Sequence, residues 1–499
     1  MTDYGKKVLA VLLALLMITA PIGCAEDTGS EGQSPKETAG DAAVPAETEE
    51  TEPPYSDNLP ADLYYEDRTI RFLTNNMETK SIELREEDDV GDVVNDAYYR
   101  RNEALNERLG VTLERTETVH YDNYNSAVNQ FIQAGTDDYD ILCGHARFNV
   151  SLAANGAVLE MGENGVMDYV DITKPYWSQL WIENANYGNH IYWLTGDLTE
   201  RYISTIYALF VNMTVWNNHY SEDNLYDLVL EGKWTFDRMT ANSEGLYSDL
   251  NHDGNRDIKD AFGVVMQKGH TLNGMMFGLG MEYSTDNGDG NYSMTINNEH
   301  TIDIYNKLYE LYCQTDYGFR FENYDTEALY MLSEDRVLFV PHIFGAAENA
   351  IAREMESDFI IIPLPKYNEE QANYRVNQYD GVPIYGLPVT LPEENIPMMA
   401  AVLEAMCSMT SDMVIPVYYD VALKTKYSRD PNTAQMIDII HDSVDTDFAF
   451  IWADTVGGLI DIYTSNLENG KIASVLKRMD KIWHTNLTKL TETLASGND

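Results

Sequence analysis

The stretch that decides the fold runs from residue 138 to residue 148 and has the sequence DYDILCGHARF. Residues 139–142 predict a short buried strand, which opens into a loop at residues 144–148. A helical pattern at residues 123–134 precedes this strand. Strands that alternate with helices predict an α/β protein with a parallel sheet, whose ligands bind beyond the carboxyl ends of the strands.

The alternation of strands and helices extends over most of the chain. Helices are predicted at residues 92–109 and 472–494, the second with its apolar side chains on one side. The sequence at residues 286–290 predicts a hairpin turn. Further strands are predicted at residues 69–73, 111–113, 207–211, 262–266, 337–340, 359–364 and 389–391.

Composition narrows the possible classes of protein. The chain has 499 residues, of which 44% are hydrophobic, and a formal net charge of −49. That hydrophobic share is typical of a folded soluble protein, and the length suits two lobes. Nucleic-acid binding depends on Lys and Arg side chains that neutralise phosphates, so the acidic balance argues against a nucleic-acid partner.

The first 24 residues have the pattern of a secretion signal. Lys6 and Lys7 precede an apolar run, residues 8–20, that is shorter than the ~20 residues of a membrane-spanning helix. The sequence PIGC at residues 21–24 resembles a bacterial lipobox, although Leu is usual in place of its Pro. We expect a lipoprotein signal peptide and lipidation of Cys24; the alternative is a secreted protein in which Cys24 is incidental.

The residues that follow, 25–60, predict a disordered acidic linker. Residues 25–54 carry nine acidic side chains against Lys36 and hold no aromatic residue. Such a segment buries too little apolar surface to fold. No later stretch is expected to be apolar for long enough to span a membrane, so a lipid on Cys24 is the expected attachment to the bilayer.

Three cysteines remain for the folded body: Cys143, Cys313 and Cys407. Each lies among apolar residues, and their spacing matches neither a C-x-x-C pair nor a metal motif. We expect buried, small hydrophobic side chains, with at most one disulfide.

One local motif predicts a metal site. Residues 249–260 have the sequence DLNHDGNRDIKD, with oxygen-bearing side chains at loop positions 1, 3, 5, 9 and 12 and Gly at position 6. That pattern is typical of calcium loops, because Ca²⁺ takes oxygen ligands and Gly permits the sharp turn. The expected ligands of a structural Ca²⁺ are Asp249, Asn251, Asp253, Asn255 through its backbone carbonyl, Asp257 and Asp260.

Two positions of this motif depart from a sensor EF-hand. Position 12 is Asp260 rather than Glu, and position 8 is Arg256 rather than an aliphatic residue. The motif resembles the calcium loops of dockerins and thrombospondin-type repeats more closely. The alternative is a plain acidic turn.

Easily recognised catalytic motifs are absent from the sequence. It contains no G-x-S-x-G elbow, no H-E-x-x-H helix, no Walker A loop and no G-x-G-x-x-G after a strand. We therefore expect a protein that is not an enzyme. With 82 Asp and Glu residues, a pair of glycosidase carboxylates stays open as an alternative, since such a pair needs no fixed spacing in the sequence.

Four segments together resemble the extracellular solute-binding proteins of bacterial ABC importers, family 1, which includes maltose-binding protein. They are residues 138–159, residues 188–212, the GKWTFD sequence at residues 232–237, and residues 335–366, which end in PLPK. The resemblance implies a two-lobed α/β fold of the type II periplasmic-binding-protein kind, with a ligand cleft between the lobes. It places lobe one at residues 61–167 and 358–411, and lobe two at residues 168–357 and 412–499.

The same resemblance implies which residues bind the ligand. Aromatic rings would stack on a sugar, and Arg, His and Asp side chains would bind its hydroxyl groups. A structural role is the alternative for each of these residues, and Trp234 and Trp483 are expected in the core. The implied ligand-binding residues are His145, Arg147, Phe148, Tyr192, Trp193, His270, His342, Phe344, Tyr379, Asp380, Trp452 and Asp454.

These features together predict a monomeric, lipid-anchored lipoprotein on the extracellular face of the cell membrane. It would capture a carbohydrate, expected to be an oligosaccharide, and deliver it to the transmembrane subunits of an ABC permease. The alternatives are a binding protein for a peptide or another nutrient, a surface glycoside hydrolase, and an adhesive lipoprotein.

Overall fold

The computed structural model describes residues 56–76, 82, 93–162, 165–220, 224–288, 291–321, 326–348, 350–424 and 431–496. The predicted signal peptide, Cys24 and most of the predicted linker lie outside the described residues. Residues 53–499 form one compact unit.

Strands and helices alternate along this unit. The strands are β1 (Arg68–Asn75), β2 (Val111–Val119), β3 (Ile141–His145), β4 (Tyr207–Asn212), β5 (Phe262–Gln267), β6 (Ser284–Asp286), β7 (Tyr292–Met294), β8 (Gly318–Phe321), β9 (Val337–Ile343), β10 (Phe359–Ile362) and β11 (Pro383–Gly386). The helices are α2 (Val93–Leu109), α3 (Tyr121–Ala134), α4 (Ala146–Asn149), α5 (Ser151–Ala154), α6 (Gln179–Ala185), α7 (Arg201–Ser204), α8 (Met213–His219), α9 (Leu225–Leu230), α10 (Phe236–Ser243), α11 (His270–Gly278), α12 (Glu299–Tyr309), α13 (Thr326–Ser333), α14 (Ala350–Glu354), α15 (Ile396–Met413), α16 (Ile415–Lys424), α17 (Pro431–Asp442), α18 (Phe448–Ile451), α19 (Ala453–Val456), α20 (Leu459–Asn466) and α21 (Ile472–Ala495).

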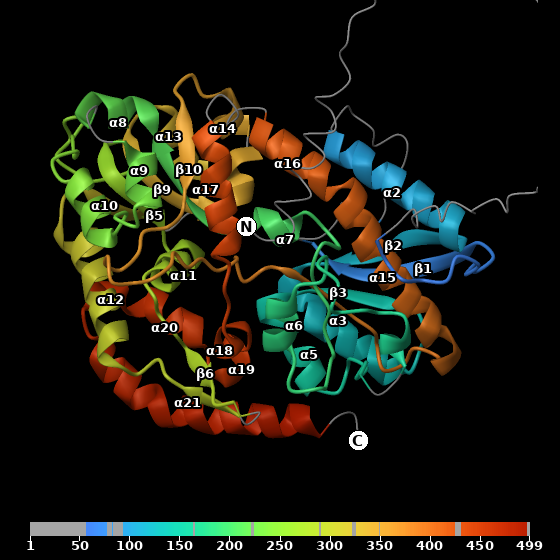
Figure 1. The fold of residues 1–499 in the computed structure, drawn as a ribbon. Coiled ribbons are helices and arrows are strands. Elements are labelled where there is room, and N and C mark those ends of the chain that lie inside the picture. The colour runs from blue at the N-terminus through green and yellow to red at the C-terminus, as the bar shows by residue number, and fades with distance from the viewer. Residues whose placement is uncertain are drawn as a thin grey trace, which may run out of the picture. The chain divides into compact units, whose positions relative to one another are not determined.

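The first sheet has the strand order β11-β3-β1-β2. Strand β1 pairs in parallel with both β2 and β3, and β11 pairs antiparallel with β3. The apolar residues of β1 and β3 are buried on both faces, as is usual for parallel strands covered by helices. Helices α2 and α15 run side by side next to this sheet (Figure 1).

The second sheet has the strand order β10-β4-β9-β5-β8. Strands β10, β4 and β9 pair antiparallel, whereas β9, β5 and β8 pair in parallel. Helix α10 approaches β5 so closely that a Cβ added at Gly263 would lie 2.4 Å from the Cβ of Ser243. Glycine is therefore required at that position of the strand.

Most of the predicted strands and helices are confirmed, and some are wrong. Residues 389–391 form a turn, and the strand lies earlier, at β11; the Val389 N–H instead bonds to the Ala157 carbonyl oxygen at 3.2 Å. Strand β2 continues six residues beyond the predicted end at residue 113. Both sheets are mixed rather than wholly parallel, because β11, β4 and β10 run antiparallel to a neighbour.

The folded body begins before the predicted end of the linker. The guanidinium of Arg108 donates two hydrogen bonds of 2.6 Å to the carboxylate of Asp57, and the Ser56 hydroxyl donates to Asp412 at 3.0 Å. Burial opposes the charge of Asp57, but Arg108 outweighs it and lowers the pKa of that carboxyl below its ordinary value. The end of the predicted linker, residues 56–60, thus contacts the folded body.

One described helical stretch contradicts the expectation about membrane-spanning segments. Residues Glu393–Tyr419 are long and apolar enough to cross a membrane by length and composition alone. However, 78% of the apolar 18-residue segment within this stretch is buried inside the body, which is typical of a core helix. Within the stretch, α15 packs against α2.

The predicted core tryptophans and thiols can be placed directly. Trp234 and Trp483 are both 0% exposed, as predicted. Cys143 and Cys407 are buried, Cys313 is half-buried, and all three are free thiols. The half-exposure of Cys313 departs from the prediction of a buried side chain.

A short crossing segment, residues 376–380, links the two sheets. Its backbone pairs with residues 205–207 through hydrogen bonds from the Tyr207 N–H to the Asn377 carbonyl (3.1 Å) and from the Tyr379 N–H to the Thr205 carbonyl (2.7 Å). Val376 also pairs with residues 443–445. Strand β10 precedes this crossing and lies in the second sheet. The expected boundary at residue 358 assigned this strand to lobe one.

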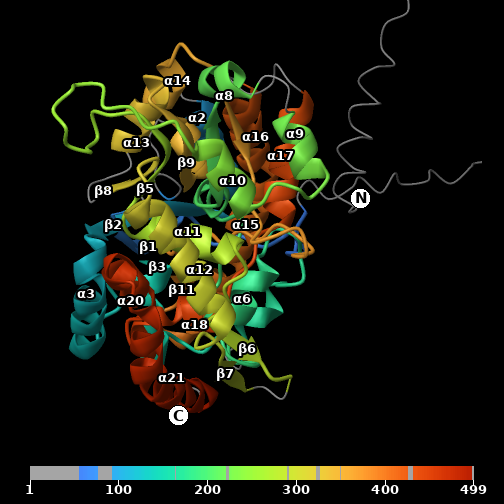
Figure 2. The ribbon, with the colours of Figure 1, turned by 90° about the vertical axis from the view of Figure 1, so that its left-hand side faces the viewer.

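The β6–β7 hairpin is attached to the amino end of α18 by Asp447. This carboxylate is 7% exposed and accepts hydrogen bonds from the Tyr283 N–H (3.0 Å), the Ser284 N–H (2.8 Å) and the Ser284 hydroxyl (2.6 Å). It also caps α18 by accepting from the Ala449 N–H at 2.9 Å. The hairpin lies next to α21 in both views (Figures 1 and 2).

We predict that Asp447→Ala lowers the free energy of unfolding by about 2–4 kcal/mol, because it removes a helix cap and leaves buried donors unsatisfied. Urea denaturation at pH 7 measures the change. Asp442→Ala, at a carboxylate whose side chain is 70% exposed, is the matched control and should change the stability little. Equal stabilities of the two variants would contradict the role assigned to Asp447.

Candidate functional site

The candidate site is built where the crossing segment meets the carboxyl end of β3. The Ala146 N–H bonds to the Val382 carbonyl oxygen, and the Arg147 N–H bonds to the Asp380 carbonyl oxygen, both at 3.0 Å. The sequence predicted a loop at residues 144–148, but the end of β3 and helix α4 lie there instead, and these two bonds fix the start of α4 to the segment that joins the sheets. An added Cβ at Gly381 would lie 2.8 Å from the Nε2 atom of His145, so the approach is close.

Four rings gather at this place. Phe148 stacks on Tyr121, with ring centroids 5.1 Å apart and an interplanar angle of 15°. His145 contacts Phe148 at 4.7 Å and Tyr379 at 5.9 Å between centroids. Within this aromatic cluster, Tyr121, Phe148 and Tyr379 are partly exposed residues, whereas His145 is buried.

Arg147 lies beside this aromatic cluster and contacts three carboxylates. Its guanidinium donates to Asp461 at 2.8 Å, to Asp454 at 3.2 Å and to Asp380 at 3.3 Å, and it lies 5.1 Å from the ring centroid of Phe148. Burial disfavours the charge of Arg147, but the three carboxylates outweigh burial and raise its pKa. The sequence analysis assigned Arg147, Asp380 and Asp454 to one site. In the structure, Arg147 contacts both of these carboxylates.

His145 is 1% exposed, and its Nδ1 atom has no hydrogen-bond partner among the described residues. Burial lowers the pKa of His145 from 6.5 to about 3, and the positive charges of Arg201 and Arg147 act in the same direction. The imidazole is therefore neutral at physiological pH. A neutral imidazole can donate from one ring nitrogen and accept at the other.

Further polar groups without partners lie on the segments around Asp380. Asn377 is 0% exposed, and within the described part of the chain neither its Nδ2 nor its Oδ1 atom has a hydrogen-bond partner. The Tyr283 hydroxyl is likewise buried and unpartnered there, and burial raises its pKa, with smaller contributions from the charges of Asp447 and Asp380. Buried polar atoms are nearly always paired, so these groups are candidates for binding a ligand or water.

The other residues implied by the family resemblance are buried or not described. Tyr192, Trp193, Phe344 and Trp452 are each 3% exposed or less, and His342 is 4% exposed. Tyr192 donates to the Leu494 carbonyl oxygen (3.2 Å) and Trp193 to the Val150 carbonyl oxygen (3.1 Å), which are contacts of a core. His270 begins α11, and its side chain lies outside the described part of the structure.

Sequence reasoning missed Tyr121, Asn377 and Asp461. Tyr121 follows the carboxyl end of β2, and its N–H bonds to Asn76 at the end of β1 at 2.9 Å. Ligands bind beyond strand ends, so a strand predicted to reach residue 119 would have pointed to Tyr121. The predicted strand ended at residue 113 instead. Asn377 could have been included, because it lies two residues before the predicted Tyr379 in the same polar run. Asp461 follows no strand, and no feature of the sequence around it pointed to a binding site.

The predicted calcium loop lies between α10 and β5. Asp249 accepts from the Gly254 N–H at 3.0 Å, Asp253 accepts from the Asn255 N–H at 2.7 Å, and Asp260 accepts from the Asp257 N–H at 3.1 Å. Asn251 donates to Asp253 at 2.9 Å. Among the described residues, no group of three or more His, Cys, Asp or Glu side chains is arranged to hold a metal ion, so Ca²⁺ binding stays a prediction.

Comparisons with known proteins bear on the fold. No protein-family model and no curated protein matches the chain. Its structure is similar to UgpB from Mycobacterium tuberculosis in complex with glycerophosphocholine, with 15% identity and a TM-score of 0.54 over 86% of this chain and 98% of that chain. It is also similar to the maltose/maltodextrin-binding domain MalE from Bdellovibrio bacteriovorus bound to maltotriose, with 12% identity and a TM-score of 0.52 over 86% and 99%.

A third similar structure is the ABC substrate-binding protein Lmo0181 from Listeria monocytogenes in complex with cycloalternan, with 11% identity and a TM-score of 0.51 over 86% and 100%. These neighbours are binding proteins. The chain therefore has the two-lobed, periplasmic-binding-protein-like fold of ABC solute-binding proteins of the maltose-binding type, as its sequence predicted.

We predict that His145 makes the stability of the protein depend on pH. A histidine whose pKa falls from 6.5 to about 3 on folding contributes stability that is complete above pH 6.5 and is lost as the pH falls. Between pH 7.5 and pH 5.0, His145 should lower the free energy of unfolding by about 2 kcal/mol. The His145→Gln variant should lack this contribution to the pH dependence.

Urea denaturation at the two pH values measures the difference. His484→Gln, at a histidine whose side chain is 49% exposed, is the control and should leave the wild-type difference intact. Equal pH dependence in wild type and His145→Gln would contradict burial of a neutral imidazole.

Proposed function

We propose that the chain is the solute-binding component of an ABC importer and that it captures a carbohydrate. The observation that carries this proposal is the fold shared with binding proteins whose solved complexes hold maltotriose, cycloalternan and other sugars. The protein would bind and release its ligand without covalent chemistry. Closure of two lobes around the ligand would give the permease a two-state signal.

The chemistry of the candidate site supports a neutral, polyhydroxylated ligand. The partly exposed rings of Tyr121, Phe148 and Tyr379 offer the apolar surface on which sugar rings stack. Buried Asn377 and His145 offer unpaired hydrogen-bonding atoms for hydroxyl groups. Site carboxylates outnumber Arg147, so an anionic sugar such as a uronate oligomer would be disfavoured.

The setting that we propose for this binding is the outer face of a cell membrane. The lipobox-like sequence at residues 21–24 supports lipidation of Cys24, and the acidic residues 25–55 would act as a spacer between bilayer and body. The partners would be the lipid bilayer and the transmembrane subunits of the permease. We propose a monomer, because one chain supplies both sheets and the whole candidate site.

A second candidate ligand is a glycerophosphodiester. UgpB, one of the similar structures, holds glycerophosphocholine rather than a sugar. Arg147 could pair with a phosphate, and the carboxylates and rings around it could bind the cationic choline end. The excess of carboxylates over Arg147 makes this ligand the weaker candidate.

We predict that a thermal-shift screen of neutral mono- and oligosaccharides finds a saturable stabiliser. A sugar present at about one hundredfold its Kd should raise the Tm by about 3 °C, because it binds only the folded state. Glycerophosphocholine and a peptide mixture are screened in parallel. Stabilisation by either of these with no response to any sugar would reject the carbohydrate proposal, and release of reducing ends from a glycan would favour a hydrolase.

We predict that Phe148→Ala weakens binding of the sugar found in that screen at least tenfold, because stacked ring surface is lost. Asn377→Leu, which keeps the volume and removes the polar atoms, should weaken binding to a similar extent. Isothermal titration calorimetry measures both. Tyr330→Ala, at an aromatic residue that is 52% exposed on α13, is the matched control. Unchanged affinity in both site variants would place the ligand elsewhere.

A further inference from the structure

The loop at residues 249–260 has its two ends held together by backbone hydrogen bonds. The Ser248 N–H bonds to the Ala261 carbonyl oxygen at 3.1 Å, and the Ala261 N–H bonds back to the Ser248 carbonyl oxygen at 3.0 Å. Because Asp249 and Asp260 are the next residues inside this antiparallel bridge, they lie opposite each other at the base of the loop. Two carboxylates are thus brought together by the fold.

Each of these two carboxylates has a buried oxygen that lacks a partner. Asp260 is 0% exposed; its Oδ2 atom accepts the Asp257 N–H of the loop, and its Oδ1 atom has no hydrogen-bond partner among the described residues. The Oδ1 atom of Asp249 is also buried and without a partner there. Two neighbouring carboxylates with buried, unpaired oxygens repel each other and are costly to desolvate, unless a cation lies between them.

We propose that residues 249–260 bind one Ca²⁺ ion, with Asp249 and Asp260 as its inner ligands. Asn251 and Asp253 are exposed and lie in the same turn, where the Gly254 N–H bonds to Asp249. Their side-chain oxygens can move onto the ion. The backbone carbonyl of Asn255 and the carboxylate of Asp257 complete an all-oxygen set, which favours a hard cation such as Ca²⁺ over Zn²⁺.

Arg256, the unusual residue at position 8 of the motif, anchors the loop where an aliphatic residue is usual. Its guanidinium lies 5.7 Å from the ring centroids of both Phe262 in β5 and Phe319 in β8, and it donates to the Gly318 carbonyl oxygen. Cation–π contacts of this kind stabilise a loop against aromatic rings. The departure from the motif is therefore compatible with a calcium loop.

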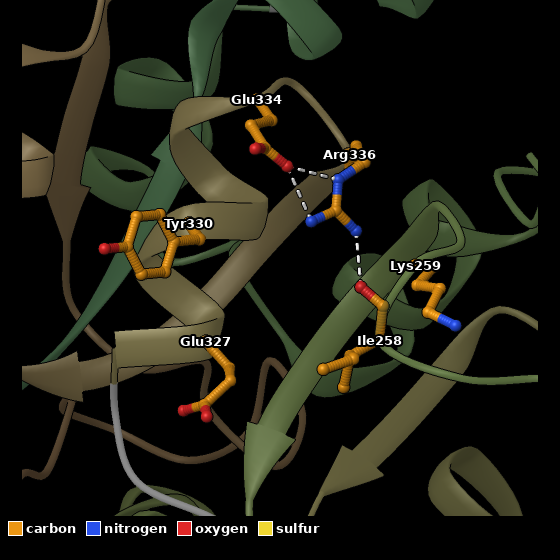
Figure 3. A pocket seen from close by; sticks show the side chains of 6 residues that line it. All are labelled: Ile258, Lys259, Glu327, Tyr330, Glu334 and Arg336. Carbon is orange, nitrogen blue, oxygen red and sulfur yellow. Dashed lines mark hydrogen bonds and ion pairs between the residues drawn. The ribbon is translucent and has the colours of Figure 1, made fainter.

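The carboxyl end of the loop is anchored by Arg336, at the start of β9. Its guanidinium donates to the Ile258 carbonyl oxygen at 2.5 Å and pairs with Glu334 (Figure 3). It also donates to the Asp260 carbonyl oxygen at 3.1 Å. The loop is thus attached to β5, β8 and β9 of the second sheet. A bound Ca²⁺ would stabilise this part of the sheet, which does not include the candidate ligand site.

The test uses the purified full-length protein in 0.15 M NaCl, which screens weak binding to the acidic surface. In the wild type, 10 mM Ca²⁺ added after EDTA treatment should raise the Tm by about 2–3 °C, for a Kd of ~10⁻⁴ M. Equimolar Mg²⁺ should have a smaller effect, because Mg²⁺ gives up its water ligands reluctantly. Equilibrium dialysis should find one Ca²⁺ per chain that Mg²⁺ does not displace.

Asp260→Asn keeps the acceptor for the Asp257 N–H and removes the charge, so it should lose the Ca²⁺ response. Asp253→Ala should lose most of the Ca²⁺-induced rise in Tm. Because Asp253 is exposed, this variant should fold and tests the proposal even if Asp260→Asn does not fold. Asp286→Ala is the matched control, since Asp286 also accepts a turn N–H, that of Gly288 at 2.7 Å, in an acidic hairpin. A wild type that does not respond to Ca²⁺, or loop variants that respond like the control, would overturn the proposal whether or not a sugar binds.

Discussion

The pairing of the crossing segment, residues 376–380, is the constraint on which the rest of the structure depends. Four backbone hydrogen bonds of 2.7–3.1 Å hold it between residues 205–207 and residues 443–445. These bonds join three stretches that are far apart in sequence, so they form only when those distant parts of the chain have come together. Side chains on the segment add to the attachment, since Gln378 is 0% exposed and bonds to Trp181 and to the Tyr202 carbonyl oxygen.

The same pairing assembles the candidate site. Because successive side chains of an extended segment point in opposite directions, neighbouring residues of the segment serve different parts of the molecule. Gln378 bonds to Trp181 of α6, Tyr379 contacts His145 at the end of β3, and Asp380 pairs with Arg147. The segment that links the two sheets therefore also supplies residues of the candidate site, and a change in its pairing would displace both the link and those residues.

Sequence reasoning found the parts of this arrangement that have a local signal. The run from Ile141 to Phe148 could be predicted in part, because an apolar strand ends there and strand ends carry ligand sites, although helix α4 stands in place of the expected loop. Residue type alone could not separate buried Trp452 from exposed ring surface, because burial depends on packing between distant segments. β11 was misplaced because Pro383 and Gly386 weaken its strand pattern, although pairing with β3 satisfies its backbone.

The three ion pairs of Arg147 differ in how strongly solvent weakens them. Asp380 is 7% exposed, the most buried of the three carboxylates that the guanidinium contacts, and its carbonyl oxygen also accepts the Arg147 N–H. The side chains of Asp454 and Asp461 are 38% and 60% exposed, and ion pairs that exposed contribute about 1 kcal/mol or less each. The contacts of Arg147 to α19 and α20 are therefore weak enough for another polar group to replace, whereas its more buried contact to Asp380 is weakened less by solvent.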